Sequence, residues 1–558
     1  MYTQSLFNYH RRNTSITKVG DCIIGGQHHI VLQSMGNTDT NDTLASAAQA
    51  HRIYQAGGEI VRFTTQGKKE AQNIAIIRQT LHDQYHCDVP LVADVHFNAS
   101  VAETAAETAA KVRINPGNFV TPQGTSSHYT TAQEKKEEEM IATALHRVIE
   151  QCKNKHVALR IGVNHGSLSP RMMFKHGDTP MGLVMSCIEF LELCQNEDFH
   201  NIVLSVKASN VVIMVETVRL LVEEMNKREM FYPLHLGVTE AGDGEDGRVK
   251  SAVGIGSLLV DGIGDTIRVS LSESPENEIP VAKQIANYTQ QLTGIQHIDE
   301  TINKQFNPFV YHKRESIEID GIGGNNAPIV ISQTTNEKAD LTLDNIKHLP
   351  RIQYAELTPT FIEKLKTHPT AIILYSKSQH PIGEMRACFH RLMNEGVNVP
   401  VIIERTYDLP YKDLQIVAAI ELGALFIDGF GNGIILKSTQ TTDEQCTELA
   451  LSILQATRSR MSKVEYIACP SCGRTMFDLT TTLQQIKQAT AHLKAIKIGV
   501  MGCIVNGPGE MADADYGYVG AGRGKISLYK KQQCIEKNIP EEQAVQKLIE
   551  LLKKDGIQ

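Results

Sequence analysis

The stretch Ala158-Leu159-Arg160-Ile161-Gly162-Val163-Asn164 is a short apolar run that carries an arginine and ends on an asparagine. Such a run predicts a buried β-strand. Similar runs alternate with helix-length segments from about residue 28 to residue 271, at 29–34, 59–65, 91–96, 111–116, 202–208, 234–240 and 266–271. Eight β/α units in succession predict an N-terminal TIM (β/α)8 barrel.

Polar and charged residues gather at the carboxyl-terminal ends of these predicted strands. They are Arg62, Asp94, His96, Arg113, Asn115, Arg160, Asn164, Lys207, Thr239, Glu240, Arg268 and Ser270. A TIM barrel has its active site at that end. The five cations, on five different strands, exceed what an apolar barrel interior tolerates without an anionic ligand. Because arginine binds phosphate oxygens in pairs, we expect a diphosphate ligand.

Three cysteines lie near the carboxyl terminus, Cys469 and Cys472 in a CxxC loop and Cys503 further on, with Glu510 following Cys503. A structural zinc site uses four Cys or His ligands, whereas an iron–sulfur cluster held by three thiolates leaves one iron free for a substrate. A zinc ribbon or a redox-active dithiol fits less well, because Cys503 is single. The residues alone leave zinc and iron–sulfur sites open.

The composition excludes several classes of protein. With a net charge of −8 and a pI near 6.2, the chain has no general attraction to nucleic acid or to an anionic membrane. No apolar run approaches the length of a membrane span, and residues 1–18 lack the apolar core of a secretion signal. The 11 scattered cysteines suit a reducing compartment. We therefore expect a cytoplasmic enzyme.

The region between the barrel and the cysteines predicts a second α/β domain, with strands at 328–332, 353–357, 371–376, 399–404 and 424–428. Residues 260–265 (Val-Asp-Gly-Ile-Gly-Asp) resemble residues 427–432 (Ile-Asp-Gly-Phe-Gly-Asn), which suggests a degenerate second barrel. The first of these segments is followed by Arg268, whereas the second is followed by Ile434 and Ile435. We therefore expect the second barrel to lack the charged residues at its strand ends. The predicted domains are 1–290, 291–460 and 461–558, the last of α+β class.

Two local patterns outside the predicted strands also give expectations. The segment 132–149 predicts a charged helix with Glu137, Glu138 and Glu139 on its solvated face. The glycine-rich residues 520–524 look like a phosphate loop, but a strand rather than a helix follows them. A hairpin turn is the better interpretation.

The motifs taken together resemble the 4-hydroxy-3-methylbut-2-enyl diphosphate synthase family, in its three-domain, plant-type form. The resemblance covers both ends of the chain, and its motifs occur in order. They are Val61-Arg62, Ala93-Asp94-Val95-His96-Phe97, Arg113-Ile114-Asn115-Pro116-Gly117-Asn118, Arg160-Ile161-Gly162-Val163-Asn164, Ser205-Val206-Lys207-Ala208-Ser209, Gly237-Val238-Thr239-Glu240-Ala241-Gly242, Gly264-Asp265-Thr266-Ile267-Arg268-Val269-Ser270, and Ala468-Cys469-Pro470 with Cys503 and Glu510.

The resemblance implies an oxidoreductase of isoprenoid biosynthesis by the methylerythritol phosphate pathway. The implied reaction is reductive ring opening and dehydroxylation of 2-C-methyl-D-erythritol 2,4-cyclodiphosphate to 4-hydroxy-3-methylbut-2-enyl diphosphate. Electrons would come from ferredoxin or flavodoxin through a [4Fe–4S] cluster. The implied cluster ligands are Cys469, Cys472, Cys503 and Glu510. The protein would be a monomer or a homodimer.

The resemblance also gives the barrel residues their expected roles. Diphosphate would be bound by the residues at the strand ends: Arg62, Arg113, Asn115, Arg160, Asn164, Lys207, Thr239, Arg268 and Ser270. A leaving hydroxyl needs a proton from a positioned acid, and Glu240 is our first choice, with Asp94 or His96 as the second. Alternatively, Glu240 forms a salt bridge with Lys207 or Arg268.

Two alternatives from other functional classes remain. One is a TIM-barrel lyase or transferase that acts on a phosphorylated substrate and has a structural zinc domain. The other is a binding module in which the last domain is a partner-docking zinc ribbon. If the chain is instead a synthase of the family named above, we expect its cysteine domain to close over the barrel of its own chain. The hinges would lie near 272–278 and 456–463, and the middle region would be a spacer.

Overall fold

The computed structural model describes residues 1–120, 129–292, 297–469, 472–503, 511 and 513–557. The chain divides into two compact units. The unit called here the barrel unit contains residues 13–247, 264–283 and 463–558, and the middle unit contains residues 1–12, 248–263 and 284–462. The barrel and the cysteines therefore belong to the same unit.

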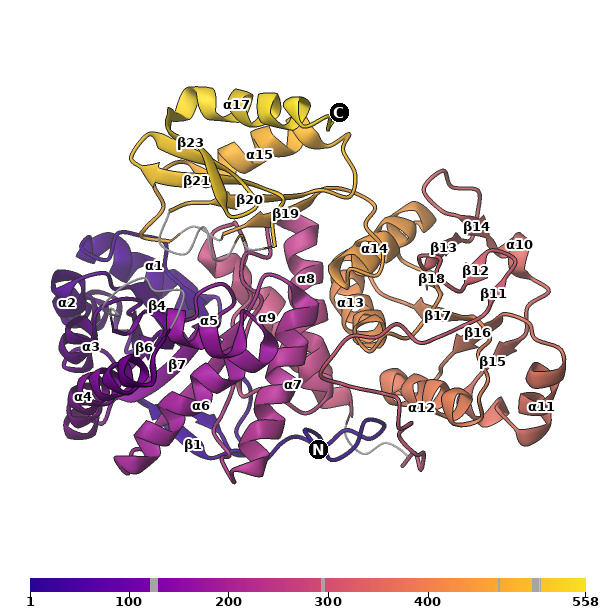
Figure 1. The fold of residues 1–558 in the computed structure, drawn as a ribbon, viewed down its shortest axis with the longest axis horizontal. Helices are drawn as coiled ribbons and strands as arrows, with labels where there is room; N and C mark the ends of the chain where they lie inside the picture. Colours follow the sequence, from indigo (N-terminus) through magenta and orange to yellow (C-terminus); the bar gives the residue numbers. More distant parts are fainter. Residues whose placement is uncertain (121–128, 293–296, 470–471, 504–510, 512, 558) are drawn as a thin grey trace. The chain divides into compact units, whose positions relative to one another are not determined.

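The predicted TIM barrel is confirmed in the barrel unit (Figure 1). Its parallel strands are β3 (Val31–Met35), β4 (Ile60–Thr64), β5 (Leu91–Asp94), β6 (Lys111–Ile114), β7 (Ala158–Asn164), β8 (Ile202–Lys207), β9 (His235–Leu236) and β10 (Thr266–Ile267). They neighbour one another in the order β8-β7-β6-β5-β4-β3-β10-β9, and a bridge between Leu204 and Leu234 closes the circle. β9 and β10 are shorter than predicted, so the polar residues at 237–240 and 268–270 lie on loops.

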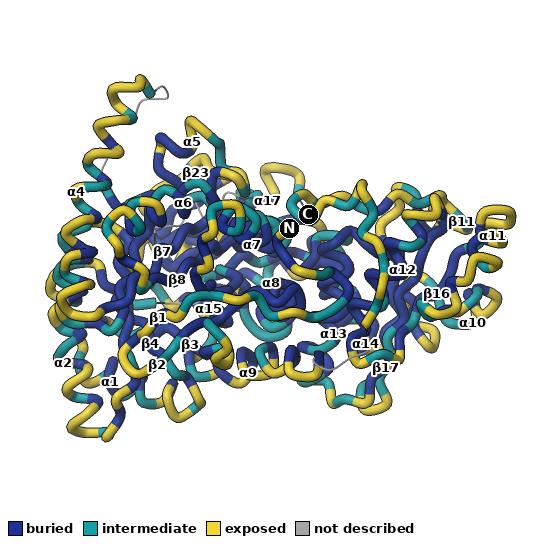
Figure 2. The backbone as a smooth tube through the Cα atoms, turned by 90° about the horizontal axis from the view of Figure 1, so that it is seen from below, coloured by how far each residue is buried: buried dark blue, intermediate teal, exposed yellow. Residues whose placement is uncertain are grey.

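Helices surround the barrel and leave its strands buried (Figure 2). They are α1 (Thr43–Gln55), α2 (Lys68–Tyr85), α3 (Ala99–Ala106), α4 (Thr131–Lys155), α5 (Pro170–His176), α6 (Pro180–Asn196) and α7 (Val211–Lys227). The hairpin of β1 (Ile16–Val19) and β2 (Cys22–Gly25) packs Val19 and Ile24 against Val31, Ile60 and Val92, the residues near the start of their strands. The amino-terminal end of the barrel is thus plugged, and only the carboxyl-terminal end can receive a ligand.

Helix α4 corrects one prediction about surface charge. Glu138 and Glu139 are exposed as expected, but Glu137 is only 4% exposed. Its carboxylate accepts a hydrogen bond from the buried Arg171 at 3.2 Å. The charge run therefore includes one member that faces inward, because a buried arginine requires an anion.

The cysteine-bearing part of the barrel unit is an α+β domain, as predicted. Its sheet contains β19 (Glu465–Ala468), β20 (Lys497–Met501), β21 (Tyr516–Gly522), β22 (Lys525–Lys530) and β23 (Gln533–Pro540), in chain order. The first three strands are parallel and the last two pairings are antiparallel. Helices α15 (Leu479–Thr490) and α17 (Glu541–Lys554) complete its core. The turn predicted at residues 520–524 is confirmed as the tip of the β21–β22 hairpin.

The middle unit contains an open sheet of six parallel strands. They are β13 (Ile329–Ser332), β14 (Leu341–Thr342), β15 (Arg351–Ile352), β16 (Ile372–Tyr375), β17 (Val401–Tyr407) and β18 (Gly433–Ser438), in the order β14-β13-β18-β17-β16-β15. Its longer helices are α11 (Pro359–Thr367), α12 (Pro381–Asn394), α13 (Tyr411–Ile427) and α14 (Asp443–Ala456). Successive strands neighbour one another as in a barrel, except that β14 and β15 do not pair. The expectation of a degenerate barrel is confirmed in this sense.

Two strand predictions in the middle unit are wrong. Residues 424–428 were expected to form a strand but contain the end of α13, and the strand is β18 instead. Residues 353–357 contain the 3-10 helix η4 (Tyr354–Glu356), which follows the short strand β15. Helix α13 is buried on nearly all sides, so its sequence lacks the polar face that would distinguish a helix from a buried strand.

A repeat within the middle unit extends the resemblance between residues 260–265 and 427–432. Arg12 N donates to Gly262 O at 2.8 Å, and Arg314 N donates to Gly429 O at 2.9 Å. The segments that end at the two donor arginines are also alike. They read Tyr-His-Arg-Arg at 9–12 and Tyr-His-Lys-Arg at 311–314. Each glycine has a positive φ, and a Cβ there would lie about 2 Å from a carbonyl oxygen of the paired segment. The same local structure is therefore built twice, as an internal duplication requires.

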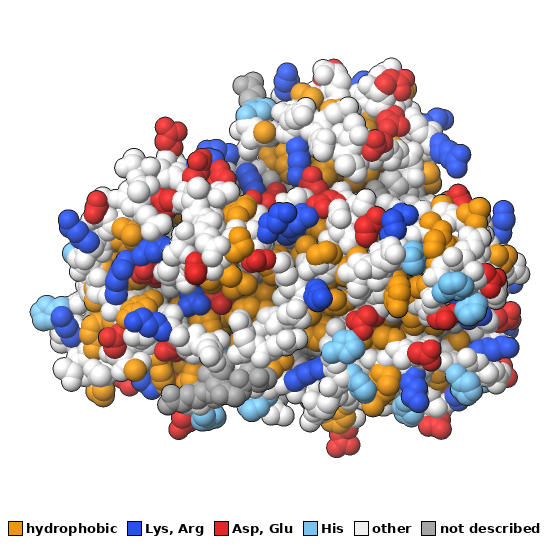
Figure 3. Space-filling view, turned by 180° about the vertical axis from the view of Figure 1, so that it is seen from behind, with side chains coloured by type: hydrophobic (Ala, Val, Ile, Leu, Met, Phe, Trp, Pro, Cys, Tyr) orange, Lys and Arg blue, Asp and Glu red, His pale blue; other side chains and the backbone are white. Residues whose placement is uncertain are grey.

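Surface charge and hydropathy are unremarkable. Among the described residues, none of the helices combines the length and the apolar composition needed to cross a bilayer. On the face drawn in Figure 3, cationic and anionic side chains are interspersed, in keeping with the modest net charge of −8. The dense group of cations lies inside the barrel.

Candidate active site

One cavity brings the predicted barrel residues and the cysteines together. Its lining includes Arg62, Asp94, His96, Arg113, Arg160, Asn164, Lys207, Thr239, Glu240, Arg268, Ser270, Cys469, Cys472 and Cys503. All of these residues belong to the barrel unit of a single chain. Glu510 lies outside the described residues, as do Pro470 and Ser471 between the first two cysteines.

Asn115 is the predicted barrel residue that the structure does not bring to the cavity. Its Oδ1 accepts from Gly117 N at 3.2 Å and its Nδ2 donates to Ser167 Oγ at 3.1 Å. It thereby caps the short 3-10 helix η1 (Pro116–Asn118). This position indicates a structural role, and asparagine at a helix N-cap is common for that reason.

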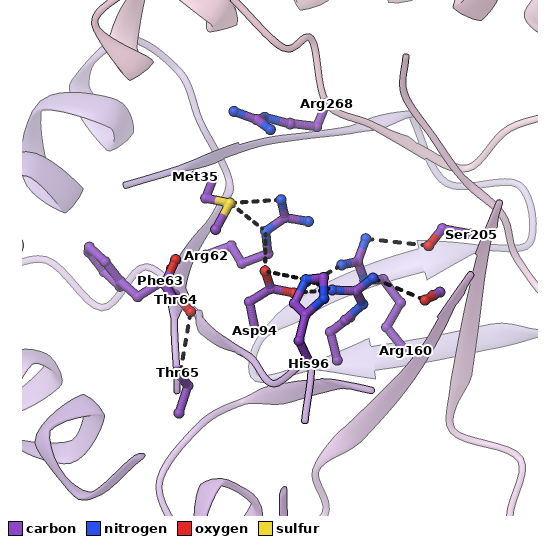
Figure 4. Close-up of polar contacts among 12 residues, drawn as sticks. Met35, Arg62, Phe63, Thr64, Thr65, Asp94, His96, Arg160, Ser205 and Arg268 are labelled. Carbon is purple, nitrogen blue, oxygen red and sulfur yellow. Dashed lines mark hydrogen bonds and ion pairs between the residues drawn. The ribbon is translucent and has the colours of Figure 1, made fainter. Parts of the chain in front are cut away.

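Asp94 is the shared anion of the barrel cations (Figure 4). Its carboxylate lies 3.1 Å from Arg113 Nη1, 3.5 Å from Arg160 Nη2 and 4.0 Å from Arg62 Nε. Burial alone would raise the pKa of Asp94, but the charges of Arg62 and Arg113 and a hydrogen bond with His96 hold it well below its usual range. Asp94 is therefore ionised and cannot serve as a proton donor near neutral pH.

The remaining cations lack enough negative charge around them. Burial and the charges of Arg62 and Arg160 lower the pKa of Lys207 well below its ordinary value. Burial and the charges of Arg268 and Arg113 lower the pKa of Arg62 to about 10, although the Asp94 carboxylate opposes them. Within the described part of the chain, Lys207 has no hydrogen-bond or ion-pair partner, and the buried Ser270 Oγ has no hydrogen bond. Such an arrangement favours an anionic ligand.

Arg268 differs from the other predicted cations. It forms a two-point ion pair with the buried Glu278, with Nε and Nη2 at 3.0 and 2.7 Å from the carboxylate oxygens. The ion pair that the structure gives for Arg268 is with Glu278, so the alternative in which Glu240 is neutralised by Lys207 or Arg268 stays a prediction. The positive charge available to a ligand is therefore greatest at Arg62, Arg113, Arg160 and Lys207.

His96 and Glu240 complete the polar lining. Burial, Arg113 and Arg474 lower the pKa of His96 well below its ordinary value, so its imidazole is neutral. Glu240 is 4% exposed and has a φ of 48°, in the left-handed region that a non-glycine residue seldom adopts. Residues held in such conformations are concentrated at functional sites, where surrounding structure supports the strain.

The cysteines reach the cavity because the last sheet is attached to the barrel loops. Ala468, the last residue of β19, forms a parallel bridge with Ala241, next to Glu240. Ser272 Oγ donates to Cys469 O at 3.0 Å, and Gly502 N donates to Cys469 Sγ at 3.1 Å. Because β19 and β20 are parallel neighbours, their carboxyl-terminal ends place Cys469 and Cys503 at the same edge of the sheet.

Three cysteine thiols are the possible metal donors at this end of the cavity. Burial raises the pKa of the Cys469 thiol, and the nearby Cys472 and Cys503 raise it further. A bound cation reverses this effect, since thiolates are the metal-ligating form. Among the described residues, no three His, Cys, Asp or Glu side chains are grouped to hold one metal ion. In a cluster each thiolate binds a different iron, so the sulfur atoms need not converge on one point.

Arg474 also lines the cavity and was missed from the sequence. It follows the CxxC loop and is 6% exposed, with Nη2 3.3 Å from Asp94 Oδ2 on the barrel. The available signal was its position directly after Cys472-Gly473, since a charged residue beside a cysteine loop that enters a cavity requires a partner. Met35 was missed too, and its Sδ accepts a hydrogen bond from Arg62 Nη2 at 2.8 Å.

Comparisons with known proteins agree with this geometry. Residues 14–283 match the family model described as GcpE TIM-barrel domain, and residues 465–554 match the GcpE protein C-terminal domain. The chain is 50% identical to 4-hydroxy-3-methylbut-2-en-1-yl diphosphate synthase (flavodoxin) of Phocaeicola vulgatus, over 99% of both chains. It is 47% identical to the protein of that name from Parabacteroides distasonis, again over 99% of both chains.

A plant protein is also similar along the whole chain. The chloroplastic 4-hydroxy-3-methylbut-2-en-1-yl diphosphate synthase (ferredoxin) of Oryza sativa is 37% identical over 100% of this chain and 88% of the plant protein. The matched length includes residues 284–462 of the middle unit, which the two family models do not cover. This chain belongs to the GcpE family of 4-hydroxy-3-methylbut-2-en-1-yl diphosphate synthases.

Proposed function

We propose that this chain reduces and opens 2-C-methyl-D-erythritol 2,4-cyclodiphosphate to give 4-hydroxy-3-methylbut-2-enyl diphosphate, with flavodoxin or ferredoxin as electron donor. The names of the relatives support both the product and the donor class. The observation that carries the proposal is the cavity itself, where cations with too few anions face three cysteines of the same chain. Diphosphate binding and electron delivery require these two groups around one small substrate.

The diphosphate would be bound by the cations that share Asp94, together with Lys207. Burial and mutual repulsion lower the pKa values of Lys207 and Arg160, so their charged forms are strained without an anion. A bound diphosphate would relieve that repulsion and keep each cation protonated. Thr239, Asn164 and Ser270 line the same cavity and would supply neutral hydrogen bonds. Arg268 would act less directly, through its pair with Glu278.

Glu240 is the proposed proton donor to the leaving hydroxyl. It lies in the cavity next to the strand that carries Cys469, and it is nearly inaccessible to solvent. Burial favours the protonated form of a carboxyl group, which is the form that donates. Asp94 is held ionised and His96 neutral by their neighbours, so neither is as well suited to this role.

Cys469, Cys472 and Cys503 would hold a [4Fe–4S] cluster, with Glu510 as the fourth ligand. The barrel side chains that line the cavity are not redox-active and could not reduce a substrate by themselves. An iron–sulfur cluster supplies electrons one at a time. Burial and the neighbouring Cys472 and Cys503 raise the pKa of the Cys469 thiol, and a cluster that binds the thiolate form would offset this effect. The cluster domain would extend over residues 461–558, the barrel domain over 1–290 and the spacer over 291–460. Such an enzyme would act in the cytoplasm, as a monomer or a homodimer.

Anaerobic purification tests the proposal. We expect broad visible absorption, about four irons and four sulfides per chain, and turnover of the cyclic diphosphate with reduced flavodoxin. A colourless protein with stoichiometric zinc that leaves the cyclic diphosphate unchanged would support the lyase or transferase alternative. A protein that contains iron but does not turn over the cyclic diphosphate would support the proposed cofactor and contradict the proposed substrate.

A further inference from the structure

Arg474 belongs to the cysteine domain, yet it contacts a carboxylate of the barrel. Its Nη2, in the segment that follows Cys472, donates to Asp94 Oδ2 at the end of β5 at 3.3 Å. Its Nε is buried and has no hydrogen-bond partner among the described residues. A buried, unsatisfied donor on a charged group is costly unless a ligand completes it. Because Arg474 lines the cavity, the missing partner would be the ligand.

Two other ion pairs join the cysteine domain to the loop that follows Glu240 and to the first turn of the next helix, α8 (Gly244–Val260). Lys463 Nζ lies 2.6 Å from Asp246 Oδ1, and Lys487 pairs with Asp243. In both pairs each cation has its own carboxylate, and both pairs are partly exposed to solvent. They can attach the domain to the barrel whether or not a ligand is bound, although exposed pairs of this kind contribute little energy.

The Arg474 pair is different because Asp94 is shared. The same carboxylate also lies within 4.0 Å of Arg62, Arg113 and Arg160. In the absence of a ligand, four guanidinium groups therefore compete for one buried anion. A ligand with several negative charges would satisfy the barrel cations and leave more of the Asp94 charge to Arg474.

We propose that Arg474 is a further substrate-binding residue, with Nη2 on Asp94 and Nε on the diphosphate. The substrate would then bind both the barrel and the cysteine loop, so that its arrival fixes the loop over the cavity. This inference rests on the proposed function, because it assumes a diphosphate in the barrel. It goes beyond that function in assigning a binding contact to the cysteine domain.

Inorganic pyrophosphate tests the contact without turnover. Calorimetry on the anaerobic, cluster-containing protein should give affinity that falls by about tenfold to a hundredfold in Arg474→Met, the scale of a charge-assisted hydrogen bond. Arg474→Lys keeps the charge and should recover part of the affinity. Lys463→Met is the matched control, since it removes a cross-domain ion pair away from the cavity, and should stay within about twofold.

Hydrogen exchange tests whether the ligand fixes the loop. Pyrophosphate should slow amide exchange at residues 472–477 and at the barrel strand ends in the unchanged protein and in Lys463→Met. In Arg474→Met it should still slow exchange at the strand ends but no longer at 472–477. A merely structural arginine would change exchange in the absence of pyrophosphate and leave the pyrophosphate-dependent difference intact.

The outcomes distinguish the two proposals. If Arg474→Met binds pyrophosphate as tightly as the unchanged protein while Lys207→Met loses binding, the diphosphate site stands and the Arg474 contact is wrong. If the unchanged protein itself does not bind pyrophosphate, the diphosphate site is wrong. Iron content and the visible spectrum check that Arg474→Met keeps its cluster, and Arg474→Lys provides the test if it does not.

Discussion

The barrel and the middle sheet are built alike but differ in how their charges are paired. Both are parallel α/β structures, and in both the same turn, at Gly262 or at Gly429, precedes the last strand. At the strand ends of the middle sheet, Lys437 and Arg351 both pair with Glu404, at 2.6 and 3.2 Å. Arg405 likewise pairs with Glu421 at 2.7 Å. In the barrel, several arginines share Asp94 and Lys207 has no partner among the described residues.

This difference corrects one expectation and explains another. The charged strand ends of the middle sheet are not missing, as we expected from Ile434 and Ile435, but they are neutralised. Charged residues at the end of a parallel sheet therefore do not by themselves indicate a site. A shortage of counter-charge does, because buried cations without partners are stable only with a ligand or at a cost to the fold.

The largest expected effect is the loss of cluster and turnover when a cavity cysteine, rather than a cysteine of the middle unit, is replaced. Replacing Cys503 by serine should abolish both the cluster and turnover, because serine lacks the thiolate that holds an iron. The matched control is Cys446→Ser in α14 of the middle unit, a buried cysteine away from the cavity, which should keep its iron. Iron analysis and electron paramagnetic resonance measure both variants. Full iron and activity in Cys503→Ser would show that this residue is not a ligand.

The next effect compares the two lysines at strand ends. Lys207→Met should weaken binding of the cyclic diphosphate by about a hundredfold, since it removes a buried charge that would contact phosphate directly. Lys437→Met removes a lysine already paired with Glu404 and should leave binding unchanged. Calorimetric titration of the substrate measures both. Equal losses in the two variants would mean that charge pairing does not mark the site.

Two buried glutamates, one in each region, provide a third comparison. Glu240→Gln is nearly isosteric and should preserve substrate affinity while lowering turnover by about a hundredfold, the scale of general acid catalysis. Glu404→Gln in the middle unit should not change turnover, whatever its effect on stability. Steady-state rates with a chemical reductant measure this without the donor protein. Normal turnover in Glu240→Gln would transfer the role to another group of the cavity.

The barrel also carries an unpaired cation below its cavity, which predicts a pH effect on stability. Lys111 is fully buried, its Nζ has no partner among the described residues, and burial lowers its pKa to about 7. Between about pH 7 and pH 10.5 the unfolded chain therefore binds more protons at this residue than the folded chain does, so the free energy of unfolding rises with pH in that window. Below about pH 7 the buried lysine is charged, and its full cost to the stability of the fold is present.

Lys111→Met should accordingly stabilise the protein, by a few kcal/mol at pH 6 and by clearly less at pH 9. Thermal unfolding of the cluster-free protein at the two pH values measures the difference. Lys531→Met, at an exposed position, is the control and should show no pH-dependent gain. A gain that is equal at both pH values would mean that Lys111 is charged in the folded state.

The sequence alone predicted the barrel because its buried strands are short, apolar and evenly spaced. It also predicted the cavity residues at the strand ends, since a cation in an apolar run stands out. It could not predict partners that depend on distant contacts, such as Glu278 for Arg268 or Arg171 for Glu137. Asn115 illustrates the same limit, because a capping asparagine and a ligand-binding asparagine look alike in sequence.

Helix α13 and Arg474 show two further reasons for failure. The apolar sequence of α13 has no polar face, so periodicity could not distinguish its end from a strand. Arg474 was missed because its role depends on a contact between the cysteine domain and Asp94, which are 380 positions apart. Residues whose function requires two domains to meet cannot be recognised from the pattern of either one.

The smallest expected change is the absence of any complementation between two defective proteins. The cavity is lined by barrel residues and cysteines of one chain, so each chain should form a complete site. Glu240→Gln has an intact cluster, and Cys469→Ser has an intact acid. If sites form within one chain, mixing the two proteins under subunit-exchange conditions should leave the low rate of Glu240→Gln unchanged, because every site keeps one lesion. If chains instead exchange cysteine domains, some sites in the mixture would combine the intact acid with the intact cluster. A rise in rate that depends on protein concentration would therefore show that the site is shared between chains, and the proposed spacer role of residues 291–460 would have to be abandoned.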